Sequence, residues 1–136
     1  MFLKGHGNNE SESLPQQVIW LKGKTVTRIA AGWRHTLALT VNGQTQESTL
    51  YAWGDNSSHQ LGIGAVRSAN TPNAVIPASD AIRPAPLVKP FRPVGIAAGF
   101  CHSLCVTGMT YSSHIYPERC QTRVMCIHGV MVVLVH

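Results

Sequence analysis

Apolar and polar residues alternate over three short segments in the first half of the chain. In residues 36–41, leucine and valine alternate with threonine and alanine, and this period of two predicts a half-buried β-strand. Residues 26–31 predict a short strand that ends in small side chains, and residues 50–54 predict another with Tyr51 and Trp53 on one face. Turn residues separate these segments and no helical period is evident, so the pattern predicts an all-β chain.

Two of these segments belong to a motif that occurs twice. The run IAAGWRHTLALT at residues 29–40 returns 67 positions later as IAAGFCHSLCVT, at residues 96–107. A second pair, with a shift of 57, links GHGNNESESLPQQV at residues 5–18 with GIGAVRSANTPNAV at residues 62–75. Self-similarity of this kind is typical of repeat proteins, in which each unit buries its apolar face against its neighbours.

The two pairs predict how the chain is organised. Residues 1–28 are expected to be the end of a preceding repeat. Residues 29–95 form a complete repeat with a proline-rich insertion near residues 76–95, and residues 96–107 begin the next repeat. Beyond residue 107 the expected turn and Tyr-x-Trp-Gly strand do not appear, so residues 108–136 are predicted to be an irregular tail outside the repeat pattern. The insertion fits either a recognition loop or a stiff spacer.

The segments IAAGWRHTLALT, LYAWGDNSSHQLGIG and TPNAV together resemble the repeat of the regulator of chromosome condensation family. The resemblance implies a seven-bladed β-propeller with one four-stranded blade per repeat. Since the chain is too short to close such a ring, the expected fold is an incomplete β-propeller, with one complete blade repeat and partial repeats on each side. His59 stands where the family usually has glycine in a turn, so we expect a positive φ there, which histidine tolerates.

Several repeated positions are expected to be structural. His35 and His102 each precede a hydroxyl residue, which could suggest acid–base or metal chemistry. They occupy the same place in the repeat, however, and no oxyanion site or orienting group accompanies them, so we expect hydrogen bonds to backbone where strand meets turn. Gly32 and Gly99 are expected to be required for a positive φ or for close packing. The predicted structural motif comprises Gly32, His35, Trp53, Gly54, Gly62, Gly64, Gly99 and His102.

Trp33 and Arg34 are the candidate interaction face. The pentapeptide GWRHT is similar to one in a plant UV-B photoreceptor of the same family, where the resemblance implies tryptophans that sense light and arginines that hold a dimer. In the second copy the equivalent residues are Phe100 and Cys101, so the tryptophan cluster is not continued. Three interpretations remain open for Trp33: light sensing, binding on an exposed face, and packing against a neighbouring blade.

Charge and cysteine content indicate the kind of partner, the absence of a metal site and the cellular compartment. Eleven Lys and Arg residues against six Asp and Glu residues give a net charge of +5. The basic residues are scattered, and the balance favours acidic partners such as chromatin or an acidic protein face. The four cysteines form no Cys-x-x-Cys pair, so no metal site is predicted, and Cys101 and Cys105 are expected to act as small apolar residues. Free thiols suit the cytoplasm or the nucleus. The C-terminal apolar run is shorter than the roughly 20 residues of a membrane span.

These patterns predict a regulatory protein-binding module rather than an enzyme. No catalytic residue, cofactor site or small-molecule substrate is indicated. The specific form that the family resemblance implies is guanine nucleotide exchange on a small GTPase such as Ran. A photoreceptor similar to the plant UV-B receptor and a chromatin-binding propeller are the alternatives.

Overall fold

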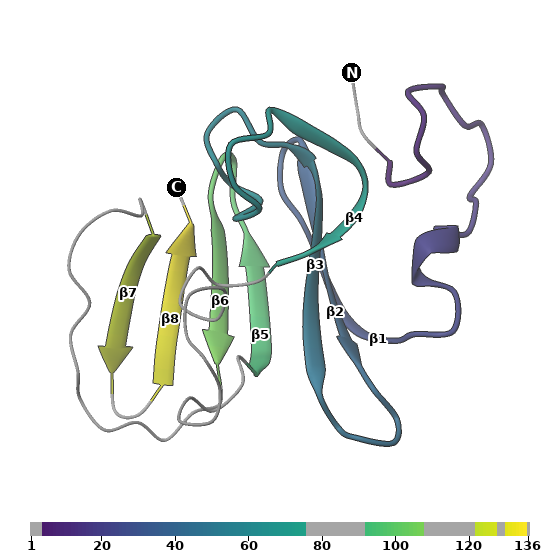
Figure 1. Ribbon diagram of the computed structural model, residues 1–136. Coiled ribbons are helices and arrows are strands. Elements are labelled where there is room, and N and C mark those ends of the chain that lie inside the picture. Colours follow the sequence, from purple (N-terminus) through teal and green to yellow (C-terminus); the bar gives the residue numbers. More distant parts are fainter. Residues whose placement is uncertain (1–3, 76–91, 108–121, 128–129, 136) are drawn as a thin grey trace.

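The first half of the chain forms a four-stranded antiparallel sheet. The computed structural model describes residues 4–75, 92–107, 122–127 and 130–135. Strands β1 (Thr25–Ala31), β2 (His35–Val41), β3 (Ser48–Asp55) and β4 (Ser68–Ala74) pair in chain order. A short 3-10 turn, η1 (Ile19–Leu21), precedes them and lies beside β4 (Figure 1). The three strands expected from the alternating pattern are confirmed as β1, β2 and β3.

A second four-stranded sheet contains strands from the region expected to be irregular. It consists of β5 (Pro93–Ala98), β6 (Ser103–Thr107), β7 (Thr122–Ile127) and β8 (Val130–Val135), in the order β5-β6-β8-β7. The prediction of an irregular tail over residues 108–136 is therefore wrong for residues 122–127 and 130–135. The physical reason is that an open strand edge needs hydrogen-bond partners, and the valine-rich β8 has a high β-propensity. Backbone pairing does not require the motif of the repeat.

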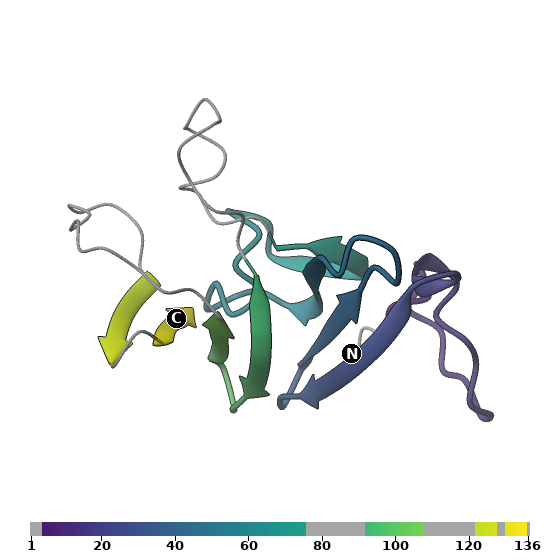
Figure 2. The ribbon, with the colours of Figure 1, turned by 90° about the horizontal axis from the view of Figure 1, so that it is seen from below.

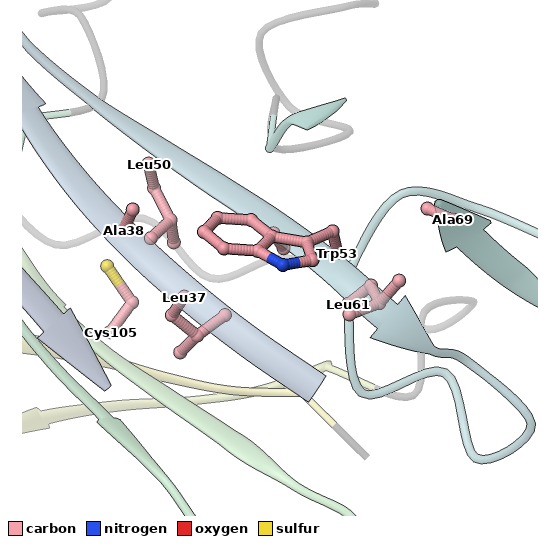
Figure 3. Packing of buried hydrophobic residues seen from close by; sticks show 8 residues of the cluster. Leu37, Ala38, Leu50, Trp53, Leu61, Ala69 and Cys105 are labelled. Carbon is pink, nitrogen blue, oxygen red and sulfur yellow. The ribbon is translucent and has the colours of Figure 1, made fainter. Parts of the chain in front are cut away.

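The two sheets pack face to face as successive blades, and the all-β, incomplete propeller fold is confirmed. Strand β5 contacts β1, β2 and β3, and Figure 2 shows β5 beside the β1–β2 side of the first sheet. The core between and within the sheets contains Leu37, Leu50, Trp53 and Cys105 (Figure 3). Burial raises the pKa of the Cys105 thiol to about 12, so it serves as a small apolar residue. Cys101 is exposed, so the same expectation is wrong for that residue.

Equivalent residues of the two repeats differ in burial, which reveals the open end of the stack. Ile96 on β5 packs against the shared core. Its equivalent in the first repeat, Ile29 on β1, is 75% exposed. In the described part of the chain, residues near the N-terminus contact β4 and Trp53 of the first sheet. Gly7 N–H donates to Asn70 O at 3.0 Å, and Gly5 lies against the Trp53 ring.

The strand limits differ slightly from the predicted repeat limits. Strand β1 begins at Thr25, before the predicted start of the complete repeat at residue 29. Residues 93–95, at the end of the predicted insertion, belong to β5. The rest of the insertion, residues 76–91, lies outside the described residues. The repeat observed in the sequence and the blade observed in the structure are therefore offset by a few residues.

His59 adopts the predicted left-handed conformation, with φ 58°. Because a Cβ is unfavourable in this region and the side chain is exposed, His59→Gly is expected to raise the free energy of unfolding by up to about 1 kcal/mol. Urea denaturation measures the difference. Ser58→Gly is the matched control, because Ser58 is exposed in the same loop without a positive φ. If both variants lose stability equally, the left-handed conformation of His59 carries no cost.

Candidate interaction face and the junction between repeats

The same tight turn joins the first two strands of each sheet. Gly32 N–H donates to His35 O at 2.8 Å, and Gly99 N–H donates to His102 O at 2.9 Å. Neither glycine has a positive φ. Instead, each lies directly against the imidazole of the histidine three residues later, and a Cβ on Gly32 would also lie 2.6 Å from Gly99 O. Close packing, rather than backbone conformation, is therefore what excludes a side chain at these two positions.

His35 connects the two sheets through a buried chain of hydrogen bonds. Its imidazole is 3% exposed, and Nε2 lies 2.9 Å from Ser103 Oγ on β6. The Ser103 hydroxyl donates to Gln60 O at 2.7 Å, in the loop between β3 and β4. A serine hydroxyl has one proton and a carbonyl only accepts, so His35 must donate from Nε2. The neutral Nε2–H tautomer follows, and Nδ1 is buried without a hydrogen-bond partner.

The charge state of His35 follows from this environment. Burial lowers the pKa of His35 because the protonated imidazole would lose its hydration, and the nearby His102 lowers this pKa further. Asp55 and a backbone contact with His102 act in the opposite direction. The net effect is a neutral ring at pH 7. A buried neutral histidine whose Nε2–H is already donated does not supply the acid–base group of an active site.

Two amide side chains, which the sequence analysis did not single out, organise the loop that holds Gln60. Asn56 Nδ2 donates to Gly64 O at 3.0 Å and to Val66 O at 2.6 Å, while Asn56 Oδ1 accepts from Leu61 N–H at 2.9 Å. The Gln60 side chain donates to Asp55 Oδ2 and accepts from Ser58 N–H, each at 2.9 Å. The signal in the sequence was the polar run DNSSHQ directly after the buried strand Leu-Tyr-Ala-Trp.

The remaining motif residues lie around this loop. Gly54 has φ 116°, and a side chain there would lie 2.6 Å from His35 Cα. Gly62 and Gly64 follow in the loop with φ 66° and 89°. Trp53 is buried in the core, as its place in the alternating segment indicated. The structure thus brings His35, Gly32, Gly54 and the loop together, while Gly99 and His102 form the equivalent turn of the second sheet.

An exposed aromatic pair lies at the same junction. The Trp33 and Phe100 rings stack with their centroids 4.2 Å apart and an interplanar angle of 14°. The guanidinium of Arg34 lies over the Trp33 ring, 4.5 Å from its centroid. Trp33 is 53% exposed and Phe100 is 60% exposed. The second repeat thus places a phenylalanine, rather than a second indole, on Trp33.

The backbone fixes this pair in place. Trp33 N–H donates to Gly99 O at 3.3 Å, next to Phe100 in the chain. We call Trp33, Arg34 and Phe100 the aromatic face. Since its members come from equivalent turns of two sheets, the aromatic face exists only while the two sheets are packed together.

Comparison with known proteins agrees with this geometry. Residues 5–39 and 47–106 match the regulator of chromosome condensation (RCC1) repeat, and a second description of the same repeat matches residues 26–60. These matches cover more than half of the chain. The chain belongs to the RCC1 repeat family. The resemblance expected from the repeated motifs is confirmed.

Several RCC1 repeat proteins are similar in sequence. The Ultraviolet-B receptor UVR8 of Arabidopsis thaliana is 32% identical, over 76% of this chain and 20% of the receptor. The human E3 ubiquitin-protein ligase HERC2 is 38% identical over 52% of this chain and 1% of the ligase. The RCC2 homolog of Xenopus laevis is 42% identical over 44% of this chain and 11% of that protein. The chain therefore spans a fifth or less of the length of each relative.

A solved structure of human WBSCR16 is also similar, with 24% identity, a TM-score of 0.41 and coverage of 82% of this chain and 17% of that one.

Across residues 4–75 and 92–107, no three His, Cys, Asp or Glu side chains form a group that could hold a metal ion. Within that same part of the chain, no helix is both long enough and apolar enough to cross a membrane.

Proposed function

We propose that this chain is a protein-binding module of a regulatory RCC1 repeat protein, and that Trp33, Arg34 and Phe100 form its contact surface. The observation that carries the proposal is the exposed Trp33–Phe100 stack with the Arg34 guanidinium over it. Tryptophan and arginine are the residues that most often dominate binding energy at protein interfaces. An exposed aromatic pair held rigidly at a junction of two sheets loses little conformational freedom when a partner binds.

The remaining motif residues support a structural rather than a chemical role. His35 and Ser103 lie at hydrogen-bond distance, as a nucleophile and its base would, but both are buried and the hydroxyl proton is donated to Gln60 O. No substrate could reach them without separating the sheets. We therefore propose that the chain binds its partner without a catalytic side chain of its own.

The more specific proposal is guanine nucleotide exchange on a small GTPase such as Ran, in the nucleus or cytoplasm. Exchange requires a surface that binds the nucleotide-free GTPase more tightly than the loaded one, and it needs no catalytic residue. The proposal predicts that the full 136-residue chain binds nucleotide-free Ran more tightly than GDP-loaded Ran in isothermal titration calorimetry. Equal affinity for both forms, or no affinity, would exclude exchange by this chain.

Two alternative functions, photoreception and chromatin binding, can be tested with the same chain. The similarity to the UV-B receptor and the Trp33–Arg34 pair favour photoreception, for which UV-B irradiation should change the oligomeric state measured by size-exclusion chromatography. The net charge of +5 favours chromatin, for which nucleosome binding should fall steeply as salt is raised. The stacking of Trp33 on Phe100 rather than on a second indole supports binding over light sensing.

The contact surface itself is tested by substitution. Trp33→Ala and Arg34→Gln are each expected to weaken binding to the responsive partner, Ran or the nucleosome, by about tenfold or more. Trp20→Ala and Arg67→Gln are the matched controls, because these residues are exposed but lie outside the aromatic face. If the control variants weaken binding as much as the test variants do, the contact surface lies elsewhere.

A further inference from the structure

One buried imidazole forms a side-chain hydrogen bond between the two sheets, close to the aromatic face. His35 Nε2 reaches Ser103 Oγ of the second sheet at 2.9 Å, and Ser103 reaches Gln60 O at 2.7 Å. Within the same turn, Trp33 N–H donates across the junction to Gly99 O. His35 therefore lies two residues from the aromatic stack and makes the side-chain link between the two sheets.

The His35 ring is closely packed against the turn in the closed junction. The backbone of Gly32 lies against Cε1 and Nδ1 of the ring, and the carbonyl of Gly99 lies beside Gly32. Nδ1 is buried and makes no hydrogen bond to the described part of the chain. A proton added to Nδ1 would thus place a charge on a buried ring, and the backbone contact with His102 compensates only in part, because the pKa of His35 is lowered overall. This buried charge disfavours the closed junction.

The charged and titratable groups around His35 do not compensate fully for such a charge. His102, in the turn before β6, lowers the pKa of His35, whereas the charge of Asp55, at the end of β3, raises it. The Asp55 carboxylate already accepts hydrogen bonds from the Ser57 hydroxyl and the Gln60 amide. The Arg34 guanidinium lies over Trp33 and also interacts with the Asp55 carboxylate, which lowers the pKa of Asp55.

We propose that His35 is an acid-sensitive latch between the two sheets, so that its protonation opens the junction and separates Phe100 from Trp33. The proton comes from solvent and binds Nδ1, while Nε2 keeps its own proton. The opened junction gives the imidazolium access to water, which the closed junction denies it. This inference stands apart from the proposed function, because it concerns whether the aromatic face is assembled and not what binds to it.

The direction of the pH effect follows from the two states. Burial, followed by the charge of His102, lowers the pKa of His35 from its ordinary value of 6.5 in the closed junction. An open junction, in which the ring meets water, binds the proton more readily. The preference for the closed form is therefore complete above pH 6.5 and decreases as the pH falls from there to the lowered pKa. Below the lowered pKa it stays constant.

The latch is tested by hydrogen exchange of the Trp33 amide, whose hydrogen bond to Gly99 O crosses the junction. NMR of the full chain between pH 7.5 and pH 5 should show this amide losing protection, after correction for the intrinsic exchange rate. The expected loss is about tenfold for each unit by which the pKa of His35 differs between the closed and open junctions. The Leu39 amide, in the middle of β2, should keep its protection. Equal loss at Leu39 would indicate general unfolding and overturn the proposal.

His35→Gln separates the latch from other titrations, because the glutamine amide can replace Nε2–H as a donor to Ser103 but does not titrate. This variant should keep Trp33 protection constant within about twofold across the same pH range, since no charge is created. His59→Gln is the matched control, because His59 is exposed, and it should behave as the wild type. An unchanged acid response in His35→Gln overturns the proposal.

If His35→Gln does not fold, the latch can still be tested with the wild-type protein. The His35 ring resonances should titrate with the same midpoint as the loss of Trp33 protection, and that midpoint should lie below 6.5. Different midpoints would show that another group opens the junction.

Discussion

Gly32→Val is expected to lower the free energy of unfolding by at least about 3 kcal/mol. The valine Cβ would overlap the imidazole of His35 and lie 2.6 Å from Gly99 O. Neither group can move without loss, because His35 is hydrogen-bonded to Ser103 and the Gly99 carbonyl accepts the Trp33 N–H. The substitution should therefore separate the two sheets as well as strain the turn. Urea denaturation followed by circular dichroism measures the loss.

Gly43→Val is the matched control for this experiment. Gly43 lies in the exposed turn between β2 and β3, has no positive φ, and has open space where a Cβ would be placed. The control should therefore change stability by no more than about 0.5 kcal/mol. Unfolding of Gly32→Val at the same urea concentration as Gly43→Val would show that the turn is not closely packed in solution.

Asn56→Ala should reduce the free energy of unfolding by about 3 kcal/mol. The buried amide bonds two carbonyls and one N–H of its own loop, at 2.6–3.0 Å, and alanine would leave all three groups without a side-chain partner. Because the loop also presents Gln60 O to Ser103, the loss should extend to the contact between the sheets. Thermal unfolding monitored by circular dichroism, together with exchange of the Leu61 amide, measures both effects.

Asn73→Ala provides the comparison for Asn56. Its amide is exposed and donates to the nearby Thr71 O, so alanine should cost no more than about 0.5 kcal/mol. If Asn56→Ala proves as mild as Asn73→Ala, water must replace the three hydrogen bonds, and the loop would not depend on the buried amide.

These effects connect the core of the repeat to its exposed surface. The absence of a side chain at Gly32 and Gly99 leaves space for the two imidazoles. The His35 imidazole is hydrogen-bonded to Ser103, and Ser103 is hydrogen-bonded to the loop that Asn56 organises. Trp33 and Phe100 stack at the edge of this arrangement. A change in the buried contacts is therefore expected to alter the surface proposed for binding, even though no buried residue touches a partner.

The sequence by itself determined the features that depend on neighbouring residues in the chain. The period of two located β1, β2 and β3, because side chains on successive strand residues point to opposite faces. The repeated motif identified the family, and the turn position of His59 predicted its positive φ, since both are properties of short segments. The structural roles of Gly32 and His35 were also predicted from their positions in a local motif.

Only the tertiary structure decided which distant residues meet. Phe100 reaches Trp33, and Ser103 reaches both His35 and Gln60, because the two sheets pack face to face, and no local pattern encodes that distance. The strand order β5-β6-β8-β7 also could not be predicted from local sequence patterns. Strands pair through backbone groups that every residue carries, so an apolar β-forming segment can complete a sheet without the motif of the repeat.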